Sequence, residues 1–258
     1  MKLFSRIIGE GGTPLLVLHG LFGMCDNWMS LGRRWAAHRE VHLIDQRNHG
    51  RSPKSEQWSY AHMAEDVAGY MEEHGLSGVH LMGHSMGGKT AMRLASEAPD
   101  LLSSLVVVDI GPKQYPIHHR TIVQALRSVP LHQMKSRSEV DAFLERSGIP
   151  EWGVRQFLMK SLSRDKEKGF EWRFHLEVID RELQKVGEEL APSGGFDGPV
   201  LFIRGGRSGY IEDDDLPGMH RFFPEMELQT VTDAGHWVQA EQPDQMHDLI
   251  RDFMESVG

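Results

Sequence analysis

The sequence predicts an α/β fold with a mostly parallel central sheet, flanking helices and an inserted helical cap. Short apolar runs alternate with amphipathic stretches, the pattern of strand–helix–strand units. After Gly111-Pro112 the chain becomes charged, helix-like and rich in large aromatic side chains, and the apolar runs return towards the C-terminus. We therefore predict a core of residues 1–112 and 196–258 and a cap over 113–195.

The individual elements follow from apolar runs, turn residues and helical spacing. Continuous apolar runs predict buried strands over Pro14–His19, Val41–Asp45, Val79–Met82, Leu105–Val108, Val200–Ile203 and Met226–Val231. Helices are expected over about 26–38, after a capping Ser59, over Met86–Glu97, and at the C-terminus, where Met246, Leu249, Ile250 and Phe253 recur at helical spacing. Ser193-Gly194-Gly195 is expected to return the chain to the core.

Composition restricts the class of protein. The chain has 258 residues, of which 40% are hydrophobic and 25% charged, as in ordinary soluble domains. Its net charge of −9 disfavours nucleic-acid binding, because a negative surface repels phosphates. The single cysteine, Cys25, cannot form an internal disulfide, which favours a reducing, cytoplasmic location. No segment approaches the ~18 apolar residues of a membrane span, and the oligomeric state is left open.

The strongest chemical signal is Gly83-His84-Ser85-Met86-Gly87, which matches the G-x-S-x-G pattern between a predicted strand and a predicted helix. Small residues on both sides allow a tight turn that lifts the serine oxygen clear of the sheet. At the helix start, backbone N–H groups face any negative charge that develops there. Ser85 is therefore the predicted nucleophile.

A serine nucleophile needs a general base and donors for an oxyanion. Asp233-Ala234-Gly235-His236-Trp237 lies between the last predicted strand and the last helix, which makes His236 the candidate base. The first donor is the N–H of Met86. The second is expected in the loop His19–Gly23, where we predict the N–H of Leu21, with Phe22 as the neighbour that orients it.

Taken together, these motifs resemble the α/β-hydrolase superfamily. The resemblance rests on the HG-x-x-G loop, the run Asp45–Ser52, the GHSMGG turn and the final AGHW-V-x-x-E-x-P stretch. In detail the chain is similar to small bacterial esterases of the YbfF type, and the similarity is weakest between Tyr115 and Phe170. It implies an esterase with a helical cap that needs no metal or organic cofactor.

The acid of the triad departs from the commonest pattern of that superfamily. The loop Arg204–Ile211, where many members carry the acid, contains no Asp or Glu. Asp109 instead ends a predicted strand beside that of the nucleophile, a position that a minority of members use, and it is the favoured acid. The alternatives are Asp213 with its neighbours Asp214 and Asp215, and then Asp233. Ser208 is expected to assist His236 through a hydrogen bond.

Aromatic side chains suggest apolar walls for an acyl ester of modest size. The candidate substrate-binding residues are Phe22, Trp152, Phe157, Trp172, Tyr210 and Trp237, although aromatic side chains such as those of the cap more often form a small core of the cap itself than a substrate wall. Adjacent His118 and His119 lack the i, i+4 spacing of helical metal ligands, so no metal site is predicted.

These residues favour the interpretation that the protein is a serine carboxylesterase that acts through an acyl-enzyme intermediate. A thioesterase would use the same triad, as would a carbon–carbon hydrolase or a cofactor-free perhydrolase. A hydrolase-fold protein that binds a ligand without turnover is the alternative from another class. The natural substrate is not determined, because a fold does not specify it.

Overall fold

The computed structural model describes residues 1–165, 169–190 and 194–257. Its centre is a seven-stranded sheet in the order β1-β3-β2-β4-β5-β8-β9, in which β1 is antiparallel to β3 and the other neighbours are parallel. The strands are β1 (Phe4–Ile8), β2 (Leu15–Leu18), β3 (Val41–Asp45), β4 (Val79–His84), β5 (Leu102–Val108), β8 (Val200–Gly205) and β9 (Met226–Val231). The predicted α/β class with a mostly parallel sheet is confirmed, and β1 is a strand that the sequence analysis did not predict.

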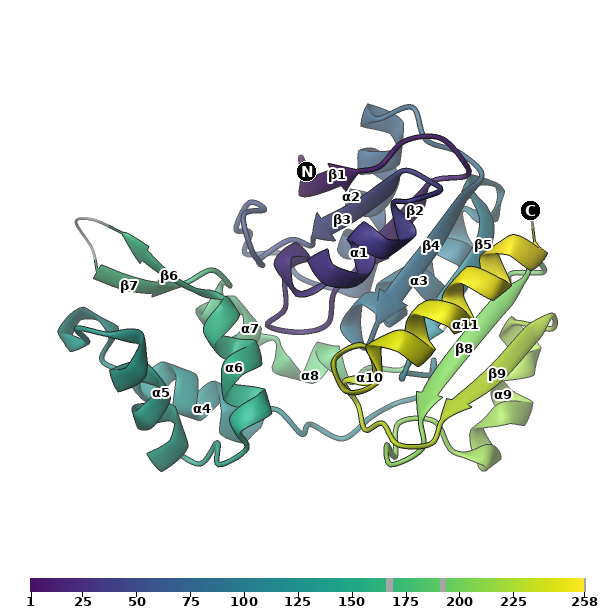
Figure 1. Cartoon of the computed structure of the whole chain (residues 1–258). Coiled ribbons are helices and arrows are strands. Elements are labelled where there is room, and N and C mark those ends of the chain that lie inside the picture. Colours follow the sequence, from purple (N-terminus) through teal and green to yellow (C-terminus); the bar gives the residue numbers. More distant parts are fainter. Residues whose placement is uncertain (166–168, 191–193, 258) are drawn as a thin grey trace.

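Helices cover both faces of this sheet (Figure 1). Leu15 and Val17 of β2 point to the face packed by α1 and α11, whereas Leu16 and Leu18 point to the face packed by α2 and α3. The two-residue period of a strand thus gives each face its own apolar core. The helices of the core are α1 (Met29–Trp35), α2 (Tyr60–Glu73), α3 (Met86–Glu97), α9 (Leu216–Phe222), α10 (Val238–Glu241) and α11 (Pro243–Ser256). Short 3-10 turns cover Cys25–Asn27, Pro99–Leu101, Leu131–Gln133 and Asp213–Asp215.

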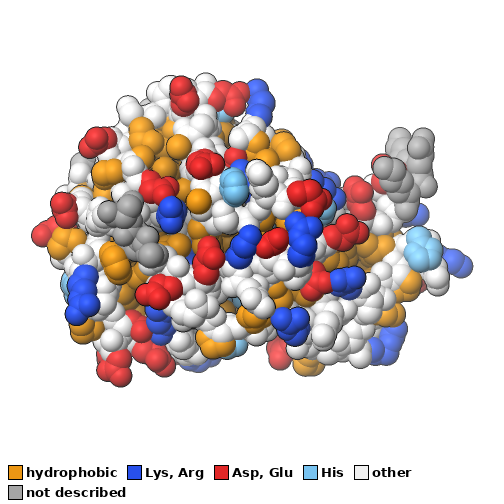
Figure 2. Space-filling model, turned by 180° about the vertical axis from the view of Figure 1, so that it is seen from behind, with side chains coloured by type: hydrophobic (Ala, Val, Ile, Leu, Met, Phe, Trp, Pro, Cys, Tyr) orange, Lys and Arg blue, Asp and Glu red, His pale blue; other side chains and the backbone are white. Residues whose placement is uncertain are grey.

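The insertion between β5 and β8, called the cap below, is largely helical and projects to one side of the sheet (Figure 1). It contains α4 (Arg120–Ser128), α5 (Arg137–Arg146), α6 (Trp152–Lys160), α7 (Leu176–Arg181) and α8 (Leu183–Val186). It also holds an antiparallel pair, β6 (Leu162–Asp165) and β7 (Gly169–Trp172), which was not predicted. The domain limits at 112 and 195 stay a prediction. Ser193, the first residue of the segment expected to return the chain to the core, lies outside the described residues. On the face shown in Figure 2, acidic and basic side chains are interspersed over core and cap alike.

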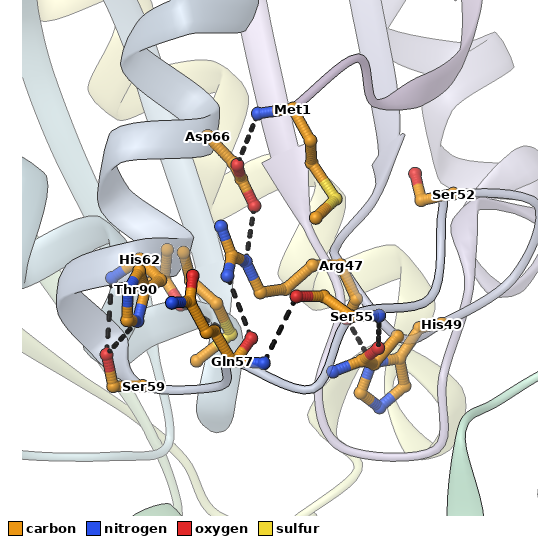
Figure 3. Close-up of polar contacts among 12 residues, drawn as sticks. Met1, Arg47, His49, Ser52, Ser55, Gln57, Ser59, His62, Asp66 and Thr90 are labelled. Atoms are coloured by element: carbon orange, nitrogen blue, oxygen red, sulfur yellow. Dashed lines mark hydrogen bonds and ion pairs between the residues drawn. The ribbon is translucent and has the colours of Figure 1, made fainter. Parts of the chain in front are cut away.

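The loop after β3 connects several elements of the core through ion pairs and hydrogen bonds. Arg47 donates to Asp66 of α2 at 2.5 Å and to the carbonyl of Gln57 at 2.8 Å, while the N-terminal ammonium of Met1 contacts the other oxygen of Asp66 at 2.6 Å (Figure 3). Ser59 caps α2, as predicted, by accepting the His62 N–H. A buried carboxylate with two cationic partners therefore anchors this loop to α2.

Candidate active site

Ser85 occupies the sharp turn between β4 and α3. Its backbone has φ 52° and ψ −118°, a positive-φ conformation that residues other than glycine rarely adopt. The two glycines of the motif make the turn possible. A Cβ at Gly83 would lie 2.1 Å from the carbonyl oxygen of Gly87, and a Cβ at Gly87 would lie 2.4 Å from that of Leu18. The turn places the serine at the first residues of α3, at the carboxyl edge of the sheet.

Asp109 and His236 meet at the same edge. Asp109 follows β5, is fully buried, and also has a positive φ, of 51°. Its Oδ2 lies 2.8 Å from Nδ1 of His236, in the loop after β9. The carboxylate accepts two further hydrogen bonds, from the Gly205 N–H to Oδ1 at 2.9 Å and from the Ser208 hydroxyl to Oδ2 at 2.5 Å. These contacts satisfy the buried carboxylate and orient it towards the histidine.

The expected bond from Ser208 to His236 is wrong, because the hydroxyl donates to Asp109 instead. The physical reason is that Nδ1 of His236 carries a proton and donates a hydrogen bond to the carboxylate of Asp109, so this nitrogen cannot accept from Ser208. The carboxylate oxygen is the acceptor that the Ser208 hydroxyl reaches. Ser208 therefore acts on the histidine only through Asp109.

The competing carboxylates lie elsewhere. The side chain of Asp213 is 80% exposed and pairs with Arg204 at 2.6 Å. Asp215 pairs with Lys113 at 2.6 Å. Asp214 and Asp233 are exposed at the surface. None of these four carboxylates forms a hydrogen bond or ion pair with His236, whereas Asp109 does.

Two further aromatic side chains position His236. Tyr210 stacks on its ring, with the centroids 4.1 Å apart and the planes at 19°. His84 donates from Nε2 to the backbone carbonyl of His236 at 2.8 Å. Burial lowers the pKa of His84 to about 3, so this ring is neutral. No role was predicted for His84, although its place beside Ser85 in the motif was a usable signal.

The loop after β2 fixes the direction of the Leu21 N–H. The carbonyl of Gly20 accepts hydrogen bonds from Nδ1 of His19 at 2.8 Å and from the Gly23 N–H at 3.0 Å. Because a trans peptide is planar, fixing the Gly20 carbonyl also fixes the N–H of Leu21, which points the opposite way. Burial lowers the pKa of His19 to about 4, and its Nε2 accepts from the Gln46 N–H, so the ring is neutral with the proton on Nδ1.

The two predicted oxyanion donors border the space next to Ser85. The Met86 N–H belongs to the first turn of α3, whose N–H groups have no acceptor within the helix. The Leu21 N–H donates to no protein acceptor within the described residues. Both groups are thus available to a ligand. Chemically, the arrangement offers a hydroxyl, a histidine paired with a buried carboxylate, and two N–H donors.

Two cavities meet at Ser85 and His119. The Tyr210 cavity is lined by Met86, Ile110, Tyr115, Ile117, Val186 and Tyr210. The Trp237 cavity is lined by Leu21, Phe22, Phe157, Leu158, His236 and Trp237. Burial lowers the pKa of His119 to about 4, so this side chain of the cap contributes a neutral ring to both cavities. From the sequence, His119 was considered only as a possible metal ligand, and its place at these cavities was not predicted.

Four of the six predicted substrate-binding residues border these cavities: Phe22, Phe157, Tyr210 and Trp237. Trp152 and Trp172 do not, and their assignment is corrected here. Trp152 begins α6 and is 68% exposed, because Val154, Phe157 and Leu158 form the helix face that meets the cavity. The ring of Trp172 stacks on that of Phe174, with the centroids 5.4 Å apart, and it is Phe174 that packs against Phe22.

Among the residues that the structure describes, no group of three or more His, Cys, Asp or Glu side chains is arranged to hold a metal ion. No helix among these residues has the length and apolar character needed to cross a bilayer.

The chain is similar to known proteins in family, sequence and structure. The family model for the alpha/beta hydrolase fold matches residues 13–161. The chain is 35% identical to the sn-1-specific diacylglycerol lipase ABHD11 of Mus musculus over 97% of this chain and 84% of the relative. It is also 35% identical to Esterase YbfF of Escherichia coli, over 95% of this chain and 94% of the relative.

The chain is also similar to solved structures. The chain superposes on the structure titled "Marine microorganism esterase" with a TM-score of 0.95 and 37% identity, covering 98% of this chain and 99% of the other. The similarity therefore extends through both the core and the cap.

Proposed function

Since the chain belongs to the α/β-hydrolase family and is a carboxylic ester hydrolase, we propose that it cleaves acyl esters by a Ser85–His236–Asp109 triad through an acyl-enzyme. The observation that carries this proposal is the 2.8 Å contact between Nδ1 of His236 and the buried Oδ2 of Asp109. With its proton on Nδ1, a neutral imidazole has an unprotonated Nε2, which is the form a general base requires.

The reaction proceeds in two halves. The hydroxyl of Ser85 attacks the ester carbonyl as His236 takes its proton, and the N–H groups of Leu21 and Met86 stabilise the oxyanion. His236 then protonates the leaving alcohol, which leaves an acyl group on Ser85. Water activated by His236 hydrolyses this intermediate and restores the serine. Asp109 orients the histidine and stabilises the imidazolium form throughout.

The two cavities suggest how an ester is oriented. His236 borders the Trp237 cavity and does not line the Tyr210 cavity. The leaving oxygen must lie next to His236 to receive its proton, so the alcohol portion occupies the Trp237 cavity. The acyl portion then extends into the Tyr210 cavity, between Ile110 and Val186. Apolar walls on both sides favour an acyl ester of modest size.

An acyl thioester is the second candidate substrate, because the same triad would cleave it. The relatives named for diacylglycerol make a glycerolipid ester a third compound to test. A cytoplasmic location remains a prediction from the single cysteine.

The proposal is tested with p-nitrophenyl esters from acetate to palmitate, with acyl thioesters and a diacylglycerol assayed beside them. A fluorophosphonate probe reports the activated serine independently of substrate. We expect hydrolysis of the shorter esters and covalent labelling of one residue, Ser85, both abolished in Ser85→Ala, with kcat lowered by ~10⁴-fold or more. Labelling and turnover that persist in a folded Ser85→Ala variant would refute the serine mechanism.

A further inference from the structure

Two segments form the neck that joins the cap to the core. They are residues 112–115, where the chain enters the cap, and residues 187–190, where it leaves. The Tyr115 N–H donates to the carbonyl of Gly187 at 2.7 Å, and the Leu190 N–H donates to that of Pro112 at 2.8 Å. A Cβ at position 187 would lie 2.3 Å from the Tyr115 carbonyl oxygen, so the close approach of the two segments requires glycine there.

Lys89 lies beneath this neck and is fully buried. Its ammonium donates to the carbonyl of Lys113 at 2.8 Å and also to the carbonyl of Glu188, one from each segment of the neck. It also faces the ring of Tyr115, with Nζ 4.9 Å from the centroid. No carboxylate among the described residues forms an ion pair with it, so backbone dipoles and an aromatic face are its partners.

The same lysine is close to the catalytic groups along the chain. Its backbone N–H donates to the carbonyl of Ser85 at 3.0 Å, so it lies one helical turn after the nucleophile. The triad mechanism does not use it. A buried charge without a counterion is costly, which suggests that its position on α3 serves the neck.

The neck in turn forms part of the active site. Tyr115, Val186 and Gly187 line the Tyr210 cavity. The hydroxyl of Tyr115 donates to the carbonyl of Tyr210 at 2.7 Å, and Tyr210 stacks on His236. A shift of the neck would therefore change both the wall of the acyl cavity and the support of the histidine.

We propose that Lys89 is a positioning residue whose charged ammonium clamps the two segments of the neck and thereby holds the acyl cavity and Tyr210 in place. This inference rests on the proposed function, because it assigns the Tyr210 cavity to the acyl group. The clamp requires the charged form, since a charge-assisted hydrogen bond is roughly twice as strong as a neutral one.

The clamp is expected to respond to alkaline pH. Burial lowers the pKa of Lys89 to about 8, and Glu188 and Glu189 oppose this shift. The other charged or titratable groups facing it are Tyr60 of α2, Tyr115 of the neck, and the Lys113–Asp215 pair. Because the pKa is lower in the folded chain than in the unfolded chain, the unfolded chain binds more protons between the two values, and deprotonation does not destabilise the fold. Activity should therefore fall above about pH 8 without a fall in stability.

The test compares kcat and KM across this pH range, on a short and a longer acyl ester, in the wild-type protein and three variants. In wild type we expect kcat/KM to fall as Lys89 loses its proton. Lys89→Arg keeps the charge and should maintain activity to higher pH. Lys89→Met should lower kcat/KM by ~10-fold or more at neutral pH, because the charged hydrogen bonds are lost. Its kcat/KM should show no further fall as the pH becomes alkaline. Lys54→Met, at an exposed position, is the control and should match wild type.

A folded Lys89→Met variant with wild-type kcat/KM and an unchanged alkaline limb would overturn the proposal. If the Lys89 variants do not fold, hydrogen exchange of the wild-type Tyr115 and Leu190 amides decides, after correction for intrinsic rates. Loss of protection above about pH 8 supports the clamp, and unchanged protection refutes it. Fluorophosphonate labelling of Ser85 distinguishes failure of this inference from failure of the proposed function. If Ser85 is labelled and the Lys89 variants behave as wild type, the role of Lys89 is refuted and the proposed function stands.

Discussion

The hydroxyl of Ser208 donates a hydrogen bond to Oδ2 of Asp109 over 2.5 Å, although 99 residues separate them in the sequence. The same oxygen accepts the Nδ1–H of His236. Ser208 therefore belongs to the support of the acid, and its effect on the histidine is indirect.

Replacing Ser208 by alanine should lower kcat moderately, by about 10-fold, because the carboxylate loses one charge-assisted hydrogen bond that holds it in place. The Gly205 and His236 contacts remain, so the loss should stay well below that of a triad residue. Kinetics on a short ester measure the effect, with Ser163→Ala in the β6–β7 pair of the cap as the control. A loss as large as that of Ser85→Ala would contradict the supporting role.

Asp109→Asn should reduce kcat by at least ~10²-fold, because an amide in place of the carboxylate favours the wrong tautomer of His236. Asp213→Asn should cost less than ~5-fold, since an exposed ion pair such as that with Arg204 contributes little. Both kcat values are measured after circular dichroism confirms each fold. The reverse order of effects would show that the acid is assigned wrongly, while leaving Ser85 and His236 in place.

Two glycine-to-alanine substitutions in helices should have opposite effects on stability. Gly87→Ala places a Cβ against the Leu18 carbonyl and should destabilise the fold by ~1–3 kcal/mol, with loss of activity, because the turn at Ser85 must shift. Gly69→Ala lies on the exposed side of α2 with nothing near its Cβ, and should stabilise by ~0.5–1 kcal/mol. Urea denaturation measures both values. If both substitutions changed the free energy of unfolding equally, the steric explanation of the turn at Ser85 would be contradicted.

The buried neutral histidines should make the fold sensitive to acid. Burial lowers the pKa of His19 to about 4 and that of His84 to about 3. Between these values and the ordinary pKa of histidine, near 6.5, the unfolded chain binds more protons, so stability must fall as pH falls. The loss amounts to ~1.4 kcal/mol per pH unit for each such histidine.

Thermal melts between about pH 7 and pH 4.5 test this dependence. The His19→Gln variant removes one of the titrating groups and should show a shallower loss of stability with falling pH. A flat profile for wild type across this range would contradict the neutral assignment of both rings.

Short-range patterns in the sequence determined most of the architecture and part of the site. Continuous apolar runs predict strands because burial of both faces requires them, and β3 and β9 begin and end at the predicted residues. The glycines around Ser85 predict the turn because the steric demand is confined to a few neighbouring residues. These signals need no knowledge of distant parts of the chain.

Only the tertiary structure decided which distant groups meet. The partly buried edge strand β1 carries no continuous apolar run, so its pairing with β3 was not visible in the sequence. Trp152 was assigned to the substrate site by its chemistry, but the rotation of α6 turns it to solvent. The partner of Ser208 and the neck above Lys89 depend on packing between segments about 75 to 100 residues apart. Such contacts follow from the close packing of whole elements, which no local pattern encodes.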